Sequence, residues 1–228
     1  MAKCAPDETD TMKTGIIGGT FNPIHLGHLA IAREMQQRFA LDRVLFIPAA
    51  TPPHKQVEGL PPFAQRLAMV ECAIAGTDGF EACDIEGRRQ GKSYSRDTLQ
   101  QLHALYPEDS FYFLIGMDSL HSLHTWYHFE DIFPLCDLVV ARRPGVAKPA
   151  STDALPVAIR GQFCYDSVLK TFCHTSGSHL YFLTESFINI SSTQIRHNLA
   201  DNRPVEEALP QAVYEYIKTH HLYASGKG

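Results

Sequence analysis

The chain has 228 residues, of which 44% are hydrophobic and 20% are charged, a composition typical of a folded globular protein rather than a disordered one. Its 20 basic and 25 acidic residues give a net charge of −5 with histidine neutral, which argues against general electrostatic binding to nucleic acid. No apolar run approaches the roughly 20 residues of a membrane span. The six cysteines include no CxxC pair. We therefore expect a cytoplasmic protein without a disulfide framework, a zinc ribbon or a membrane anchor.

Strand-like and helix-like segments alternate from residue 13 onwards. Continuous apolar runs predict six strands, at 14–18, 43–50, 80–87, 110–120, 136–145 and within 177–192. Apolar residues at helical spacing predict helices at 27–39, 62–76, 96–107, 118–133, 192–200 and 210–221. This order indicates an α/β protein with a Rossmann-like, doubly wound parallel sheet and helices on both faces. In such sheets ligands bind beyond the carboxyl ends of the strands, at the switch point.

We expect one domain with flexible ends. Residues 1–12 are polar and lack the features of a secretory signal, so they are predicted to be a disordered extension. Residues 13–223 are predicted to form the domain, and residues 224–228 a flexible tail. Within the domain, residues 146–180 have scattered proline, serine and glycine and are interpreted as a loop or an insertion.

The turn between the first predicted strand and the first helix carries glycines and two histidines. The glycines at 18 and 19 allow a ligand close to the backbone, while the helix start offers free N–H groups to an anion. His25 and His28 are three residues apart and face the same way. The stretch matches neither the GxGxxG fingerprint nor a P-loop. It is a candidate site for stabilising a reacting phosphate, with a packed histidine turn or an incomplete zinc site as the alternatives.

The string ISSTQIR, residues 190–196, is a second candidate anion site. The hydroxyl groups of residues 191–193 can cap a helix while backbone N–H groups remain for a phosphate. Arg196 lies one turn further and can reach the same anion. The alternative is an ordinary helix cap followed by a surface arginine.

Loops after other strands carry residues suited to a nucleotide. His54 and Lys55 follow two prolines that stiffen their loop, and the basic pair suits a phosphate, although a loop lysine is more often simply solvated. Gly116 permits close backbone approach, and Asp118 can hold ribose hydroxyls. Arg66, on the second predicted helix, is a candidate for a structural ion pair.

The segment after the fourth predicted strand is rich in aromatic residues and histidine. Trp126 and Tyr127 offer a stacking face for a planar ring, with a core or interface pair as an equally weighted alternative. His121, His124 and His128 fall on one stripe of the predicted helix. A metal face is conceivable there, but a polar helix face is favoured, and no metal ligands are predicted.

Several of these strings resemble a known family. GGTFNPIHLGH is similar to the [HT]xGH signature of a nucleotidyltransferase superfamily, and ISSTQIR is similar to its second signature. PPHK, GKSYSRDTL, GMDSLHSLHTW and RPG extend the resemblance, from about residue 13 to 222, to bacterial nicotinate-nucleotide adenylyltransferases. The resemblance implies transfer of AMP from ATP to nicotinate mononucleotide, giving deamido-NAD and pyrophosphate in NAD biosynthesis, with Mg²⁺ carried by ATP.

The same resemblance implies roles for individual residues. Catalysis is expected from His25, His28 and Arg196. ATP is expected to contact Gly18, Gly19, Thr20, Phe21, Gly116, Asp118, Ser192 and Thr193. The acceptor is expected to contact His54, Lys55, Tyr94, Ser95, Trp126, Tyr127 and Arg143. Ser95 stands where the family more often has threonine, which keeps the hydroxyl.

Some alternatives stay open at this point. Nicotinamide mononucleotide, phosphopantetheine or another small phosphate could replace the acceptor, and a cytidylyltransferase is a weaker alternative. A non-catalytic nucleotide-binding regulator on the same fold is an alternative from another class. The sequence does not decide between the acid and the amide acceptor, nor between a monomer and a homo-oligomer.

Overall fold

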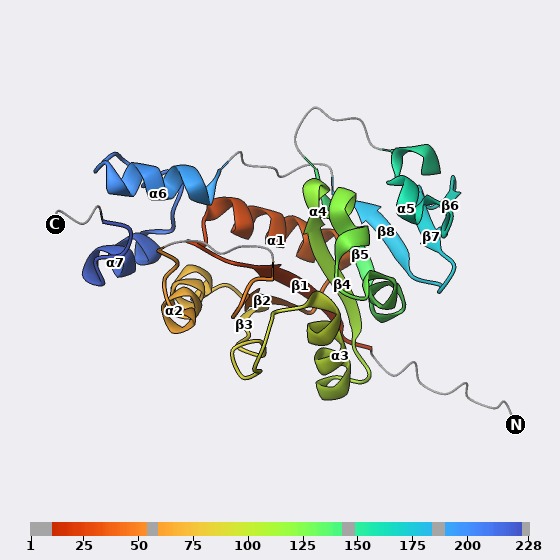
Figure 1. Cartoon of the computed structure of the whole chain (residues 1–228), viewed down its shortest axis with the longest axis horizontal. Coiled ribbons are helices and arrows are strands. Elements are labelled where there is room, and N and C mark those ends of the chain that lie inside the picture. The colour runs from red at the N-terminus through yellow and green to blue at the C-terminus, as the bar shows by residue number, and fades with distance from the viewer. Residues whose placement is uncertain (1–10, 54–58, 143–148, 184–189, 225–228) are drawn as a thin grey trace, which may run out of the picture.

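The computed structural model of the chain describes residues 11–53, 59–142, 149–183 and 190–224. Its centre is an eight-stranded sheet with the order β3-β2-β1-β4-β5-β8-β7-β6 (Figure 1). The strands are β1 Lys13–Gly19, β2 Arg43–Pro48, β3 Phe80–Ala82, β4 Ser110–Gly116, β5 Asp137–Ala141, β6 Phe163–Asp166, β7 Thr171–His174 and β8 His179–Phe182.

The six strands from β3 to β8 in this order run parallel, and β7 and β6 continue the sheet antiparallel. The chain moves outward from β1 in both directions, to β2 on one side and β4 on the other. The switch point of the sheet therefore lies between β1 and β4, where a doubly wound sheet places its ligand.

Helices cover both faces of the sheet. The α-helices are α1 Leu26–Phe39, α2 Phe63–Ile74, α3 Ser95–Leu105, α4 Met117–Ser122, α5 Val157–Arg160, α6 Ser192–Ala200 and α7 Gln211–Thr219. The 3₁₀ segments are η1 Leu123–Thr125, η2 Phe129–Leu135 and η3 Thr152–Ala154. No helix in the described ranges is both long and apolar enough to span a membrane.

Two separate apolar cores explain this layering. Ile16 packs in one core with Leu99 of α3, and its neighbour Ile17 packs in the other with Met35 of α1. Successive strand residues point to opposite faces of a sheet, so a continuous apolar run buries both faces. Figure 1 shows α1 and α3 on opposite sides of the strands. The predicted α/β class and the two-faced helical covering are confirmed.

A glycine in β1 allows α1 to lie close to the sheet. A Cβ atom added at Gly15 would lie 2.7 Å from Leu41 Cδ1 and 2.7 Å from Met35 Cε. Both side chains belong to the core on the α1 face. Because residue 15 has no side chain, α1, which carries His28, can pack close to the sheet.

The interpretation of residues 146–180 as a loop or an insertion misses the secondary structure of this segment, which contains α5 and the strands β6 and β7. Residues 163–174 form the hairpin of β6 and β7, which extends the sheet beyond β8. Its turn is closed by Asp166, whose carboxylate accepts hydrogen bonds from the backbone N–H groups of Val168 and Leu169. Each strand has four residues. Strands this short carry too little alternation to be recognised from sequence.

The predicted helix at 118–133 is confirmed only at its start, where α4 covers Met117–Ser122, and is wrong beyond that residue. It is interrupted after α4 by 3₁₀ turns, with extended backbone at Trp126 and a left-handed φ of 48° at His128. His121, His124 and His128 therefore do not share one helical stripe. The third predicted strand is shorter than expected, because residues 83–94 leave the sheet and form a loop beside the site described below.

Candidate active site

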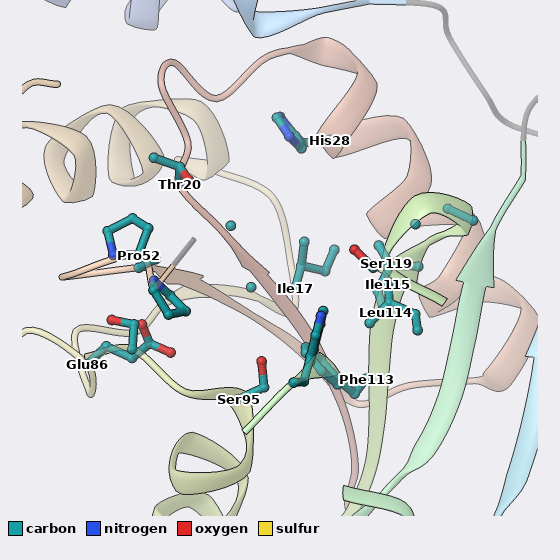
Figure 2. A pocket seen from close by; sticks show the side chains of 18 of the residues that line it. Ile17, Thr20, His28, Pro52, Glu86, Ser95, Phe113, Leu114, Ile115 and Ser119 are labelled. Atoms are coloured by element: carbon teal, nitrogen blue, oxygen red, sulfur yellow. The ribbon is translucent and has the colours of Figure 1, made fainter. Parts of the chain in front are cut away.

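A cavity of about 480 Å³ opens at the carboxyl ends of β1 and β4, at the switch point of the sheet (Figure 2). The end of β1 and the start of α1 line one part, and the end of β4 lines another. The remaining wall comes from the loop after β2, the loop before α3 and the segment after α4, with single residues from the end of β5 (Ala141) and from the segment before α6 (Ile190). From the sequence-predicted residues the fold gathers here Gly18, Gly19, Thr20, His25, His28, Tyr94, Ser95, Gly116, Trp126 and Tyr127.

The two histidines form a stacked pair at the start of α1. Their ring centroids are 3.7 Å apart with an interplanar angle of 27°. The backbone N–H of His25 donates a hydrogen bond of 3.2 Å to Nδ1 of His28. An Nδ1 that accepts a hydrogen bond leaves the ring proton of a neutral imidazole on Nε2. The geometry therefore gives His28 one N–H donor for a ligand.

Burial keeps both imidazoles uncharged. Burial lowers the pKa of His25 to about 4, and a backbone hydrogen bond offsets this only in part. Burial, followed by the nearby His25, lowers the pKa of His28 well below its usual value. The rings lie where the N-terminal end of the α1 dipole favours negative charge. At neutral pH both imidazoles are thus neutral, and a bound anion would favour their protonation.

The second signature packs against the histidine turn. Arg196 donates a hydrogen bond of 2.8 Å to the carbonyl oxygen of Asn22 and one of 3.3 Å to Thr193 Oγ1. Ser192 donates a hydrogen bond of 3.1 Å to the carbonyl oxygen of Pro23. The bonds to the carbonyl oxygens of Asn22 and Pro23 join segments about 170 residues apart in the chain.

The expected hydroxyl cap of this helix is not observed. Ser191 occupies the position before α6 and makes no side-chain cap hydrogen bond. The hydroxyl of Ser192 is directed to the carbonyl of Pro23 instead. Ser192, Thr193 and Arg196 lie against the turn that carries His25 but do not line the cavity itself. Arg196 is half-buried, and its guanidinium is held by the turn.

The aromatic residues of the opposite wall pair differently from the expectation. Tyr127 stacks on Tyr94, with ring centroids 4.4 Å apart and an interplanar angle of 25°. Trp126 instead lies 6.4 Å from Phe113, centroid to centroid. The two neighbours in sequence therefore do not form one continuous stacking face, although both line the cavity.

Some predicted site residues lie elsewhere. Phe21 is buried and packs edge-on to His28 at 5.2 Å, so it supports the histidine rather than lining the cavity. Asp118 is exposed, and its neighbour Ser119 lines the cavity in its place. Neighbouring residues on a helix point about 100° apart, so a position cannot be assigned to a face until the start of the helix is known. The expected contacts of His54, Lys55 and Arg143 lie outside the described residues.

Sequence reasoning missed several residues of the wall, among them Glu86, Ser93 and Arg96. The apolar run predicts Glu86 within the third strand, and only the short length of β3 places it in a loop. Arg66 is a candidate for a structural ion pair in the sequence. In the structure its guanidinium donates hydrogen bonds to the backbone carbonyls of Pro61, Thr20 and Ala50. No ion pair of Arg66 occurs among the described residues. Nor do the parts of the chain described here bring together three or more metal-binding side chains.

Known proteins match both the sequence and the fold. Residues 16–198 match the family described as cytidylyltransferase-like. A protein of Syntrophotalea carbinolica named "Probable nicotinate-nucleotide adenylyltransferase" is 53% identical over 94% of this chain and 98% of its own. A protein of the same name from Geobacter sulfurreducens is 50% identical over 93% of this chain and 99% of its own.

A solved structure agrees in fold. The nicotinic acid mononucleotide adenylyltransferase of Plasmodium falciparum, complexed with NaAD, superimposes with a TM-score of 0.68 at 17% identity, covering 93% of this chain and 97% of its own. The sheet, the cavity at its switch point and the family match define a nucleotidyltransferase of the cytidylyltransferase-like class. Within that class, the chain belongs to the nicotinate-nucleotide adenylyltransferase family.

Proposed function

We propose that this enzyme transfers AMP from ATP to nicotinate mononucleotide and releases deamido-NAD and pyrophosphate. The observation that carries the proposal is the stacked pair of His25 and His28, held as neutral donors at a helix N-terminus in a cavity at the switch point. The relatives at 50–53% identity support the choice of substrates.

In the proposed reaction an oxygen of the 5′-phosphate of the mononucleotide attacks the α-phosphorus of ATP. The bond between the α-phosphorus and the bridging oxygen breaks, and its electron pair leaves with pyrophosphate. Such a transfer needs no covalent enzyme intermediate, so the protein contributes positioning and charge stabilisation. The glycine-rich end of β1 lets the phosphates approach the backbone.

His28 is proposed to donate its Nε2–H to the phosphate oxygens on which charge grows, because its Nδ1 is already engaged by the backbone N–H of His25. Arg196, Ser192 and Thr193 are proposed to hold the outer phosphates, and Gly116 and Asp118 the adenosine. The acceptor is assigned to the wall of Tyr94, Ser95, Trp126 and Tyr127, together with His54, Lys55 and Arg143.

A divalent metal accompanies ATP in nucleotidyltransferases of this kind, and we propose that it is Mg²⁺. We assign this ion to the triphosphate, as part of the substrate, rather than to a resident site in the protein. When bound, the ion would neutralise part of the triphosphate charge. The proposed reaction partners, ATP and nicotinate mononucleotide, are both small molecules.

Pyrophosphate release tests the proposed function directly. The enzyme is supplied with ATP and Mg²⁺ and offered nicotinate mononucleotide, nicotinamide mononucleotide or phosphopantetheine separately. We expect turnover with nicotinate mononucleotide and a strong preference for it over the amide. Turnover with another acceptor alone would overturn the acceptor assignment, and no turnover with any of them would favour a nucleotide-binding regulator.

A variant series in the same assay tests the histidine role. His28→Ala is expected to lower kcat roughly 100- to 1000-fold, as removal of a donor to a developing oxyanion does, and to change ATP binding far less. His124→Ala, an exposed histidine outside the cavity, is the matched control and should keep its activity. An equal loss of binding and rate in His28→Ala would make His28 a ground-state contact.

A further inference from the structure

Glu86 places a buried carboxylate in the wall of the cavity. It belongs to the loop between β3 and α3, and its exposed fraction is only 8%. Figure 2 shows it near Pro52 and Ser95, on the side of the pocket away from His28. This is the acceptor end of the site as proposed above. A buried carboxylate in a substrate cavity needs compensation from hydrogen bonds or opposite charge.

Among the described residues, only one of its two oxygens has a hydrogen-bond partner. Oε1 accepts a hydrogen bond of 2.7 Å from Thr98 Oγ1, the first buried hydroxyl of α3. Arg89 donates to the same hydroxyl at 3.3 Å. Oε2 is buried and has no hydrogen-bond partner among the described residues. A native protein rarely leaves a buried carboxylate oxygen unpaired without a ligand or water to fill the role.

The positive charge of the buried Arg66 attracts this carboxylate without hydrogen bonding to it. Arg66 is 1% exposed, and its guanidinium donates to backbone carbonyls rather than to a carboxylate. Burial lowers the pKa of Arg66, while attraction to Tyr223 and to Glu86 opposes that shift. The positive charge of Arg66 therefore acts on Glu86 without occupying Oε2.

The backbone around Glu86 is held in place. A Cβ atom on the next residue, Gly87, would collide with the ring of Phe63 at the start of α2. The N–H groups of Gly87 and Arg89 donate to the carbonyls of Asp84 and Glu86 in consecutive turns. The loop is packed tightly against α2, so the carboxylate is presented to the cavity by a rigid support.

An ionised carboxylate only accepts hydrogen bonds, so its missing partner must be a donor. The phosphate and the nicotinate carboxylate of the proposed acceptor are anionic and would be repelled. The ribose hydroxyls are the hydrogen-bond donors that remain on that molecule, and its pyridinium ring carries a positive charge. We infer that Glu86 binds the acceptor by accepting a hydrogen bond from a ribose hydroxyl through Oε2. This inference rests on the proposed function and adds a specificity residue to it.

The assignment predicts that kcat/KM depends on a ribose hydroxyl of the acceptor, and that this dependence is lost when Glu86 is replaced. The probes are nicotinate mononucleotide and its 2′-deoxy and 3′-deoxy forms, compared by kcat/KM at saturating ATP. In the wild-type enzyme one deoxy form should fall roughly 10- to 100-fold below the parent, the range for a hydrogen bond to a charged group. In Glu86→Ala the parent should fall to a similar level, and the two acceptors should then differ less than about threefold.

Two further variants keep the test decisive. Glu86→Gln keeps the size and an acceptor for Thr98 Oγ1, and it should lose roughly tenfold with the parent acceptor even if Glu86→Ala fails to fold. Glu207→Gln, an exposed glutamate before α7, is the control and should match the wild type. The KM for ATP should stay within about threefold in every variant.

The outcomes separate the two claims. If Glu86→Gln and Glu86→Ala turn over at the wild-type rate and still discriminate fully against a deoxy acceptor, the proposed role of Glu86 is wrong. The proposed function is then unaffected. A loss of ATP affinity equal to the loss of acceptor affinity would make Glu86 a structural residue. No wild-type turnover with nicotinate mononucleotide would overturn the proposed function and this assignment with it.

Discussion

His25 and His28 owe their charge state to their surroundings. In water a histidine is partly protonated near neutral pH, but both rings are stacked on each other behind the start of α1 and are uncharged. A neutral pair avoids the mutual repulsion of two stacked positive charges. It also leaves an imidazole nitrogen that can take up a proton when the negatively charged triphosphate binds.

The stability of the enzyme should therefore fall in mild acid. An unfolded histidine binds a proton below about pH 6.5, whereas folded His25 does so only near a pKa of about 4. The unfolded state binds more protons in this window, so the free energy of unfolding decreases as the pH falls from 6.5 to 4. The shift corresponds to about 3 kcal/mol for His25, and His28 adds to it. Urea unfolding at a series of pH values measures the slope.

Variants assign that slope to the buried histidines. His25→Gln should flatten the dependence between pH 6.5 and 4, because glutamine does not titrate. His124→Gln, which replaces an exposed histidine, should leave the slope unchanged. An identical slope in His25→Gln and wild type would show that the acid sensitivity has another origin.

At the scale of elements, the histidine turn is held by helices far away in sequence. Arg196 of α6 binds the carbonyl of Asn22, and the hydroxyl of Tyr223, after α7, donates a hydrogen bond of 2.7 Å to the side-chain oxygen of Asn22. Asn22 is 5% exposed, so water cannot easily replace these donors. Burial raises the pKa of Tyr223, which keeps its hydroxyl protonated as a donor. The C-terminal segment thus shapes the site without lining it.

Removing that hydroxyl should loosen the turn. Tyr223→Phe leaves the buried oxygen of Asn22 without this donor and is expected to lower the free energy of unfolding by about 1–3 kcal/mol. Because the turn carries His25, kcat should fall as well. Urea unfolding and pyrophosphate release measure the two effects. Tyr216→Phe, on α7, is the control, and equal behaviour of the two variants would contradict the role of the Asn22 contact.

For the whole molecule, the switch of the sheet between β1 and β4 determines where a ligand can enter. The cavity opens at this point, and the β6–β7 hairpin extends the far edge without contributing to it. The proposed Mg²⁺ arrives with ATP, as part of the substrate. Metal dependence should therefore appear in the reaction and not in stability.

Chelation separates these two properties. EDTA in excess of total divalent metal should abolish pyrophosphate release, and added Mg²⁺ should restore it. The unfolding temperature of the enzyme without nucleotide should change by less than about 1 °C, since nothing that binds only the native state has been removed. A large drop in the unfolding temperature would reveal a resident structural metal.

Much of the fold could be predicted from local patterns. Helix α6 covers the residues expected for it, β2, β4 and β5 fall within the expected runs, and β1 extends one residue beyond its expected run at each end. Buried strands of this length can be recognised as continuous apolar runs. The prediction of one continuous helix at 118–133 is wrong beyond α4 for the opposite reason. A left-handed residue at His128 and the 3₁₀ turns are imposed by packing of Leu123 and Ile132 into the core, which no local propensity reports.

By itself, the sequence determined the α/β class, the family and the residues of the two signature strings, since these depend on short-range patterns of residue type. Only the tertiary structure decided which of those residues share a cavity, that Tyr127 pairs with Tyr94, and that Glu86 lines the cavity whereas Asp118 is exposed outside its lining. It also decided the charge of the histidines. A pKa and an unpaired oxygen depend on burial, and burial is created by segments that meet only when the chain folds.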